Sequence, residues 1–146
     1  MKNIPRSLRG ALLAGPALLL LACGDSVTDP RLQTFMGCPV REIVVDESRA
    51  GTLSSGDCLL EGAYTDMYYL EVFNDSNLII DLESFDFDAY LVLYDRDTGE
   101  LLADNDDLNS FDSDARLSGF LPRGRYVIAA TSFDVGETGQ YILTVD

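Results

Sequence analysis

Residues 88–95 read Asp-Ala-Tyr-Leu-Val-Leu-Tyr-Asp, and this stretch decides the fold. Alternate residues form two apolar faces, with Ala89, Leu91 and Leu93 on one and Tyr90, Val92 and Tyr94 on the other. A strand that is apolar on both faces is typical of a central strand that is covered on both sides. Tyr90 and Tyr94 could instead form a surface strip for a stacking ligand. The pattern favours packing, because tyrosine is commonly half buried with its hydroxyl in water.

Short stretches of alternating hydrophobicity recur along the chain, separated by turn signals such as Asn74-Asp75-Ser76 and Asp97-Thr98-Gly99. Strands are expected at residues 42–46, 50–54, 66–73, 77–84, 88–95, 100–104, 115–121, 124–132 and 140–145. Regularly spaced short strands with turns between them indicate an antiparallel sandwich or barrel. Beyond the N-terminal stretch no window has a helical period, so the predicted fold class is all-β.

The N-terminal end has the features of an export signal. Lys2, Arg6 and Arg9 precede an apolar stretch, residues 11–21, that is too short to span a bilayer. This stretch ends in Leu20-Leu21-Ala22-Cys23, which resembles the lipobox of bacterial lipoprotein precursors. The resemblance implies a signal peptide at residues 1–22 and a Cys23 that carries fatty acyl chains such as palmitate, anchoring the protein to a membrane. The alternatives are an ordinary secretory signal, or a short anchor helix with an incidental cysteine.

Two cysteines remain after Cys23, namely Cys38 and Cys58. In an exported protein they meet an oxidising environment, where a pair of cysteines is expected to form a disulfide. Such a bond would close a loop of about 21 residues and stabilise the fold by about 3 kcal/mol. Metal binding is disfavoured because the chain has no histidine, and the Cys-x-x-Cys spacing of redox sites is absent. The pair therefore predicts a structural disulfide.

The part of the chain after the signal is strongly acidic. Residues 23–146 hold seven arginines, no lysine and 25 acidic residues, which gives a net charge of −18. This charge excludes nucleic acid as a partner, because phosphate binding needs clustered lysine and arginine. It suits cations, basic partners or simple solubility.

Composition also predicts the domain organisation. Residues 23–37 are polar and rich in turn formers, which is typical of a flexible tether that follows a lipidated N-terminus. The remaining residues, 38–146, have the length of one domain. Gly24 after the cysteine is compatible with export to the outer membrane under the sorting rule of Gram-negative lipoproteins. The expected location is therefore the bacterial cell envelope, in the outer membrane or on another extracytoplasmic face.

A series of short motifs resembles, in order and spacing, a bacterial pre-peptidase C-terminal domain. The motifs are Gly51-Thr52-Leu53, Asp57-Cys58, and residues 64–70, 84–93, 103–107, 121–126 and 139–143. The resemblance covers residues 40–146 and implies a compact antiparallel β-sandwich of jelly-roll type. In that family the module usually follows a secreted protease and is not catalytic, and related collagenase modules bind calcium and matrix protein. No peptidase domain accompanies the motifs here, so a free-standing envelope lipoprotein is expected.

One acidic group suggests ligand chemistry, and it consists of Asp86, Asp88, Asn105, Asp106 and Asp107. The first two begin the central strand and the other three end the next strand, so antiparallel pairing would place them side by side. Oxygen ligands of this kind suit Ca²⁺. Carboxylates this close repel one another unless a cation or backbone N–H groups offset the charge. The two interpretations are a calcium site and a set of turn caps that accept local backbone hydrogen bonds.

The expected function is a non-catalytic binding or structural module whose ligand is a protein or a polysaccharide. Serine, cysteine and zinc hydrolases need a histidine, which this chain lacks, and no glycine-rich phosphate loop is present. One alternative is a hydrolase that uses two carboxylates, for which a short sandwich offers little room. The other alternative is a partner or chaperone of a separately encoded secreted protease.

Overall fold

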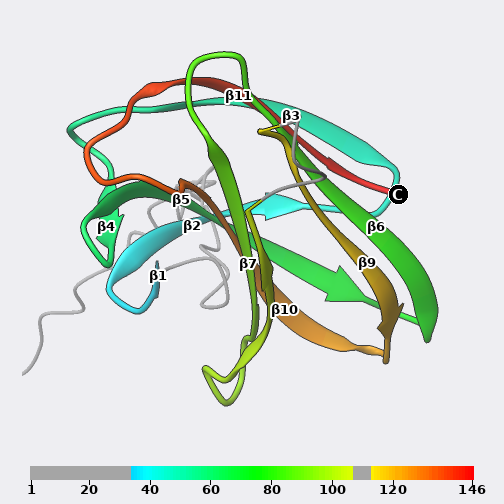
Figure 1. Ribbon diagram of the computed structural model, residues 1–146. Helices are drawn as coiled ribbons and strands as arrows, with labels where there is room; N and C mark the ends of the chain where they lie inside the picture. The colour runs from blue at the N-terminus through cyan, green and yellow to red at the C-terminus, as the bar shows by residue number, and fades with distance from the viewer. Residues whose placement is uncertain (1–33, 107–112) are drawn as a thin grey trace, which may run out of the picture.

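The computed structural model describes residues 34–106 and 113–146, and these residues form a β-sandwich (Figure 1). The strands are β1 (Thr34–Phe35), β2 (Cys38–Ile43), β3 (Glu47–Leu53), β4 (Cys58–Leu60), β5 (Ala63–Val72), β6 (Ser76–Glu83), β7 (Ala89–Asp95), β8 (Leu101–Asn105), β9 (Ala115–Leu121), β10 (Gly124–Ser132) and β11 (Gly139–Val145). The described residues contain no helix, which confirms the predicted all-β class. Accordingly, no described segment is a helix of the length and apolarity needed to cross a membrane.

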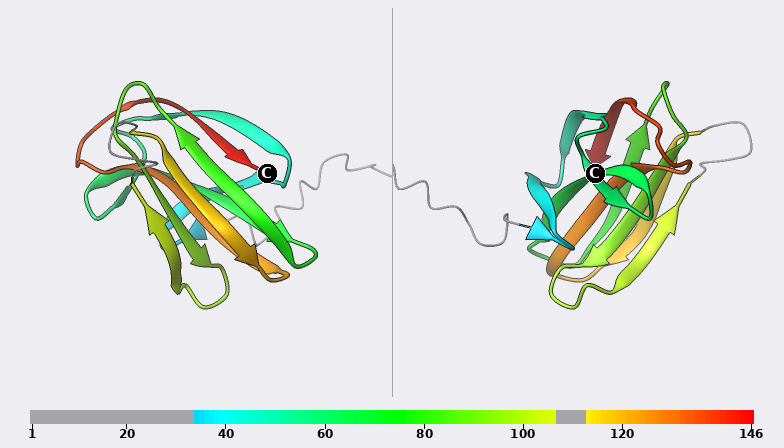
Figure 2. Two further views of the ribbon diagram at one scale, coloured as in Figure 1. Left: turned by 45° about the vertical axis from the view of Figure 1, so that its right-hand side comes forward. Right: turned by 90° about the vertical axis from the view of Figure 1, so that its left-hand side faces the viewer.

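The strands are arranged in two sheets that pack face to face, as Figures 1 and 2 show. The larger sheet has the order β1-β2-β5-β10-β7-β8, with β4 also paired to β5, and the smaller sheet has the order β3-β11-β6-β9. The strand pairs are antiparallel except β2–β5, which is parallel. The parallel pair departs from the purely antiparallel prediction. It is possible because the chain between β2 and β5 crosses to the other sheet as β3 before it returns.

The predicted alternation places the core between the two sheets. Leu70, Leu82, Leu91 and Leu143 are fully buried there, each from a different strand. Each of these strands therefore contributes one apolar face to a shared core, which is how a sandwich excludes water.

The second face of β7 is also covered, as its sequence predicts. Val92 and Tyr94 are buried in a separate outer cluster that includes Phe35 of β1. The rings of Phe35 and Tyr94 lie 5.3 Å apart. The Arg96 guanidinium donates a hydrogen bond of 3.0 Å to the carbonyl oxygen of Thr34. Thr34 and Phe35 fall in the range expected for the tether, and in the structure they are part of the sandwich.

The first predicted strand was residues 42–46, but the strand observed there, β2, ends at Ile43. A tight turn ends it there. The Glu47 carboxylate accepts a hydrogen bond of 2.9 Å from the Val44 N–H, and Asp46 has a left-handed φ of 64°. Aspartate adopts this conformation more readily than most residues do. The turn sends the chain into β3, on the opposite sheet.

Candidate functional site

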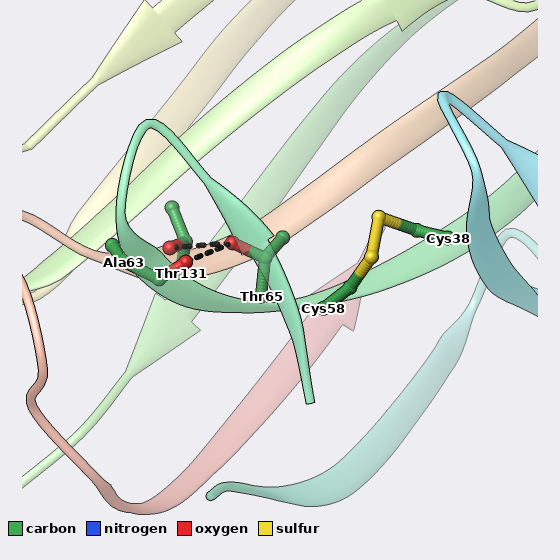
Figure 3. Close-up of a disulfide and its surroundings, with 5 residues drawn as sticks. All are labelled: Cys38, Cys58, Ala63, Thr65 and Thr131. Atoms are coloured by element: carbon green, nitrogen blue, oxygen red, sulfur yellow. Dashed lines mark hydrogen bonds between the residues drawn. A yellow bond between two sulfur atoms is a disulfide. The ribbon is translucent and has the colours of Figure 1, made fainter. Parts of the chain in front are cut away.

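The predicted disulfide between Cys38 and Cys58 forms, with the two Cα atoms 5.6 Å apart (Figure 3). It joins the start of β2 to the start of β4, and both strands pair with the same strand, β5. Beside it, the Thr65 hydroxyl of β5 donates a hydrogen bond of 2.9 Å to the Thr131 hydroxyl of β10. A covalent bond thus joins two strands that both pair with β5.

The strands next to Asp86, Asp88, Asn105 and Asp106 pair antiparallel, as was expected for the acidic group. Leu91 is opposite Asn105 in the β7–β8 ladder, so the start of β7 adjoins the end of β8. Asp107 lies outside the described residues. Within residues 34–106 and 113–146, no three acidic or cysteine side chains come close enough together to hold a metal ion. The calcium site therefore stays a prediction.

Two carboxylates near the start of β7 bind backbone N–H groups of distant residues. Asp86 Oδ2 accepts a hydrogen bond of 2.8 Å from the Gln140 N–H, and Asp114 Oδ1 accepts one of 3.0 Å from the Ser84 N–H. Gly139 allows the first contact, because a Cβ at that position would lie 2.2 Å from the Asp86 Cβ. These carboxylates cap backbone groups, as the second interpretation proposed, but between segments that adjoin neighbouring strands of the smaller sheet instead of within one turn.

A buried polar network that the sequence analysis missed joins the two sheets near β2. Asp66 is only 6% exposed, and its Oδ2 accepts a hydrogen bond of 2.5 Å from the Tyr141 hydroxyl and one of 2.9 Å from Arg41. The Tyr141 and Tyr68 hydroxyl oxygens are 2.6 Å apart. The Arg41 side chain is 54% exposed, so the network runs from the core to the surface. A buried carboxylate needs such partners, because desolvation of its charge is costly.

Burial and these hydrogen bonds raise the pKa of Tyr141 far above its usual value, so its hydroxyl stays protonated and donates to Asp66. The ring reaches this position because the facing residue, Gly51, has no side chain. A Cβ there would lie 2.1 Å from the Tyr141 ring. One sequence signal could have found this network. Asp66 has the same parity along β5 as Tyr68, Leu70 and Val72, which places an aspartate on the core face.

An apolar groove of about 450 Å³ lies at the opposite edge of the sandwich, between β8 and β9. Its lining includes Leu78, Ile80, Leu93, Leu102, Leu117 and Leu121, with Tyr126 and Asp95 as polar members. Leu102 is 45% exposed and Phe120 is 60% exposed, so large apolar side chains meet water at its rim. A concave, mostly apolar surface of this size is typical of ligand sites.

Two local features of the sequence produce this β8–β9 groove. Leu102 is an extra residue in β8, because Leu93 pairs with Ala103 while Tyr94 pairs with Leu101. The resulting bulge lets Leu102 and Ala103 both line the groove. On the facing strand, Gly119 lies between Leu117 and Leu121, and a Cβ there would meet no atom within 4 Å. The missing side chain leaves the space open.

Comparisons with known proteins bear on the fold of this chain. No protein-family model matches the sequence, and no curated protein does either. The pre-peptidase C-terminal domain of a collagenase from Bacillus anthracis, seen in a crystal structure, matches with a TM-score of 0.59 and 22% identity, over 73% of this chain and 94% of that one. A periplasmic inhibitor of g-type lysozyme from Aeromonas hydrophila matches with a TM-score of 0.44 and 13% identity, over 73% of this chain and 97% of that one. The first match shows that the chain has the β-sandwich fold of a pre-peptidase C-terminal domain.

Proposed function

We propose that this chain is a non-catalytic lipoprotein of the bacterial cell envelope, whose β-sandwich is a binding module. The β8–β9 groove is the observation that carries the binding role, because it combines a ligand-sized volume with an apolar lining and a few polar groups. The collagenase-domain fold supports a module without catalysis. The disulfide supports a location outside the cytoplasm.

The anchor in this proposal is Cys23, which carries the acyl chains and becomes the N-terminus when residues 1–22 are removed. Both lie outside the described residues, and the support for them is the lipobox resemblance of residues 20–23. Mass spectrometry of the native protein tests the anchor. A mature chain that begins at Cys23 and carries the mass of its acyl chains is the expected result. An unmodified N-terminus upstream of residue 23 would contradict the proposal.

The binding role is tested by capturing proteins and polysaccharides from envelope extracts on the purified protein. A ligand that is lost when Leu102 and Phe120 are both changed to serine is the expected result. Ile142→Ser is the matched control, because Ile142 is a similarly exposed apolar residue away from the groove. Ligand turnover by the purified protein would contradict the non-catalytic part of the proposal.

The proposal includes calcium only as a stabilising ion at Asp86, Asp88, Asn105, Asp106 and Asp107. Two of these side chains already have structural contacts. Asp86 accepts a hydrogen bond from the Gln140 N–H, and the Asn105 side-chain amide donates a hydrogen bond of 2.9 Å to the Arg116 carbonyl. Calorimetric titration with Ca²⁺ tests this part. Heat of binding together with a higher melting temperature would support it, and neither change at millimolar Ca²⁺ would leave only the capping role.

A further inference from the structure

The outer edge of β9 presents backbone groups that none of the described strands pairs with. Ile79 exchanges two backbone hydrogen bonds with Asp146, of 2.8 and 2.9 Å, so its N–H and C=O point away from β9. Ile79 is also the ladder partner of Ser118. In an antiparallel pair, the backbone groups of the two partners point either toward each other or both away. The N–H and C=O of Ser118 therefore point out from the sheet.

The same parity applies at Arg116 and Phe120, two residues to either side. The Arg116 carbonyl confirms the direction, because it accepts a hydrogen bond of 2.9 Å from the Asn105 side chain on the other sheet. That bond joins β8 to β9 beside Leu117, which lines the β8–β9 groove. Beyond it, no hydrogen bond within the described ranges reaches the outward groups of Ser118 and Phe120. The rest of the groove is thus bordered by a strand edge with which no described strand pairs.

A free strand edge and an apolar groove together specify the chemistry of an occupant. Edge N–H and C=O groups pair with another extended backbone, whereas an acyl chain offers them no hydrogen bond. In such an added strand, alternate side chains point to one side, so every second residue would enter the groove. A second copy of this chain is disfavoured, since each copy carries a charge of −18 over residues 23–146.

The charge at the groove favours a basic segment. Asp95 lies in the lining, and the hydrogen bonds from the backbone N–H groups of Thr98 and Asp97 lower its pKa, so it is ionised at neutral pH. Two arginines of β9 and β10 have carboxylate partners of their own. Arg116 binds Asp81 through two hydrogen bonds, and Arg125 forms an ion pair with Asp97.

We propose that β9 binds an extended, basic segment of a partner protein by strand addition, with the alternate apolar side chains of that segment filling the β8–β9 groove. This inference rests on the proposed binding function and names its site and its class of partner. In this arrangement, the outward backbone groups of Ser118 and Phe120 form the hydrogen bonds to the segment. The lining around Gly119 makes the apolar contacts.

Selection from a random library of displayed twelve-residue peptides on the purified full chain tests the proposal. The expected peptides alternate apolar and polar residues, carry lysine or arginine, and bind at least tenfold more weakly to Ser118→Pro. Proline at this position removes an outward N–H and leaves the hydrogen bonds to β6 intact, which an edge strand tolerates. Ile142→Ser should bind the same peptides unchanged. Leu102→Ser, on the facing strand, should weaken binding at least threefold. This variant tests the proposal if Ser118→Pro does not fold.

Other results would overturn the proposal. They are peptides that bind Ser118→Pro and Leu102→Ser as well as the parent chain, the absence of any selected peptide, or a dimer that Ser118→Pro dissociates. Capture of envelope proteins that both variants retain would refute this site and leave the proposed binding function standing. Loss of all capture by the parent chain would refute that function itself.

Discussion

The two long edges of the sandwich are filled in opposite ways. At the β2–β3 edge, the Asp66–Tyr141–Tyr68 network and the Cys38–Cys58 bond join neighbouring elements. At the β8–β9 edge, the space between the sheets is an open groove with apolar walls. Stability is often concentrated in one part of a fold while binding uses the less constrained part. We therefore expect substitutions at the first edge to change the free energy of unfolding, and substitutions at the second to change binding.

The largest effect is expected for Gly51→Ala at the closed edge. The new Cβ would lie 2.1 Å from the Tyr141 ring, so the ring must move and its hydroxyl loses Asp66 and Tyr68. Overpacking and the lost buried hydrogen bonds together should lower the free energy of unfolding by about 4 kcal/mol. Urea denaturation measures this. Gly56→Ala is the control, because its nearest atom would be 4.0 Å away. Equal urea midpoints for both variants would show that Tyr141 is not held in this way.

Removal of the disulfide comes next. Replacing both Cys38 and Cys58 by serine should lower the free energy of unfolding by about 3 kcal/mol, because the unfolded chain regains the freedom of a closed loop. The parent protein in reducing buffer provides the control, and its urea midpoint should fall to that of the double variant. The double variant itself should be insensitive to reductant. If reductant leaves the urea midpoint of the parent protein unchanged, the two thiols are not paired.

A smaller effect is expected for Tyr141→Phe, which keeps the ring and deletes the hydroxyl. Asp66 then loses its 2.5 Å hydrogen bond while it remains buried. A deleted hydrogen bond to a buried charged group should lower the free energy of unfolding by about 2 kcal/mol. Tyr90→Phe removes a hydroxyl that bonds Asp104 on the exposed face, and it should cost less than about 1 kcal/mol. If the two variants are equally stable, the buried network stabilises the closed edge no more than an exposed hydrogen bond does.

The sequence predicted the framework of this comparison better than its details. Strand alternation placed β9 and β10 at their observed bounds, and the two apolar faces of residues 88–95 correctly required cover on both sides of β7. The strands β1 and β4 were not predicted. Each has two or three residues, too few to show a period of two.

The site was harder to predict for a physical reason. Strand parity alone could have placed Asp66 on the core face, but nothing local says that Tyr141, 75 positions later, will meet it. The β8–β9 groove likewise depends on a bulge at Leu102 and a missing side chain at Gly119, which come together only when two sheets pack. The disulfide was predictable because, if Cys23 is the lipid site, only Cys38 and Cys58 are left to pair.

Alkaline pH should affect the outer face of β7 through Tyr90. Its hydrogen bond to Asp104, together with burial, raises the Tyr90 pKa from about 10 to about 12. The folded protein therefore keeps this proton longer than the unfolded chain, so the contribution is fully present below about pH 10 and is lost as pH rises toward 12. Tyrosinate absorbance of the parent protein minus that of Tyr90→Phe should titrate near pH 12. Asp104→Asn should lower this value, and a difference curve centred near pH 10 would mean that the hydrogen bond is not formed in solution.

The smallest change in stability is expected for Phe120→Ser at the open edge, and here a small effect is informative. Phe120 is already 60% exposed, so its loss removes little buried apolar surface and should change the free energy of unfolding by less than about 0.5 kcal/mol. Leu143→Ala, at a fully buried position of β11, should cost about 3 kcal/mol under the same conditions. An aromatic side chain that contributes little to folding yet stays at the rim of an apolar groove is better explained by a partner than by the core. A cost for Phe120→Ser close to that of Leu143→Ala would mean that this rim is part of the core, and that both edges of the sandwich serve stability.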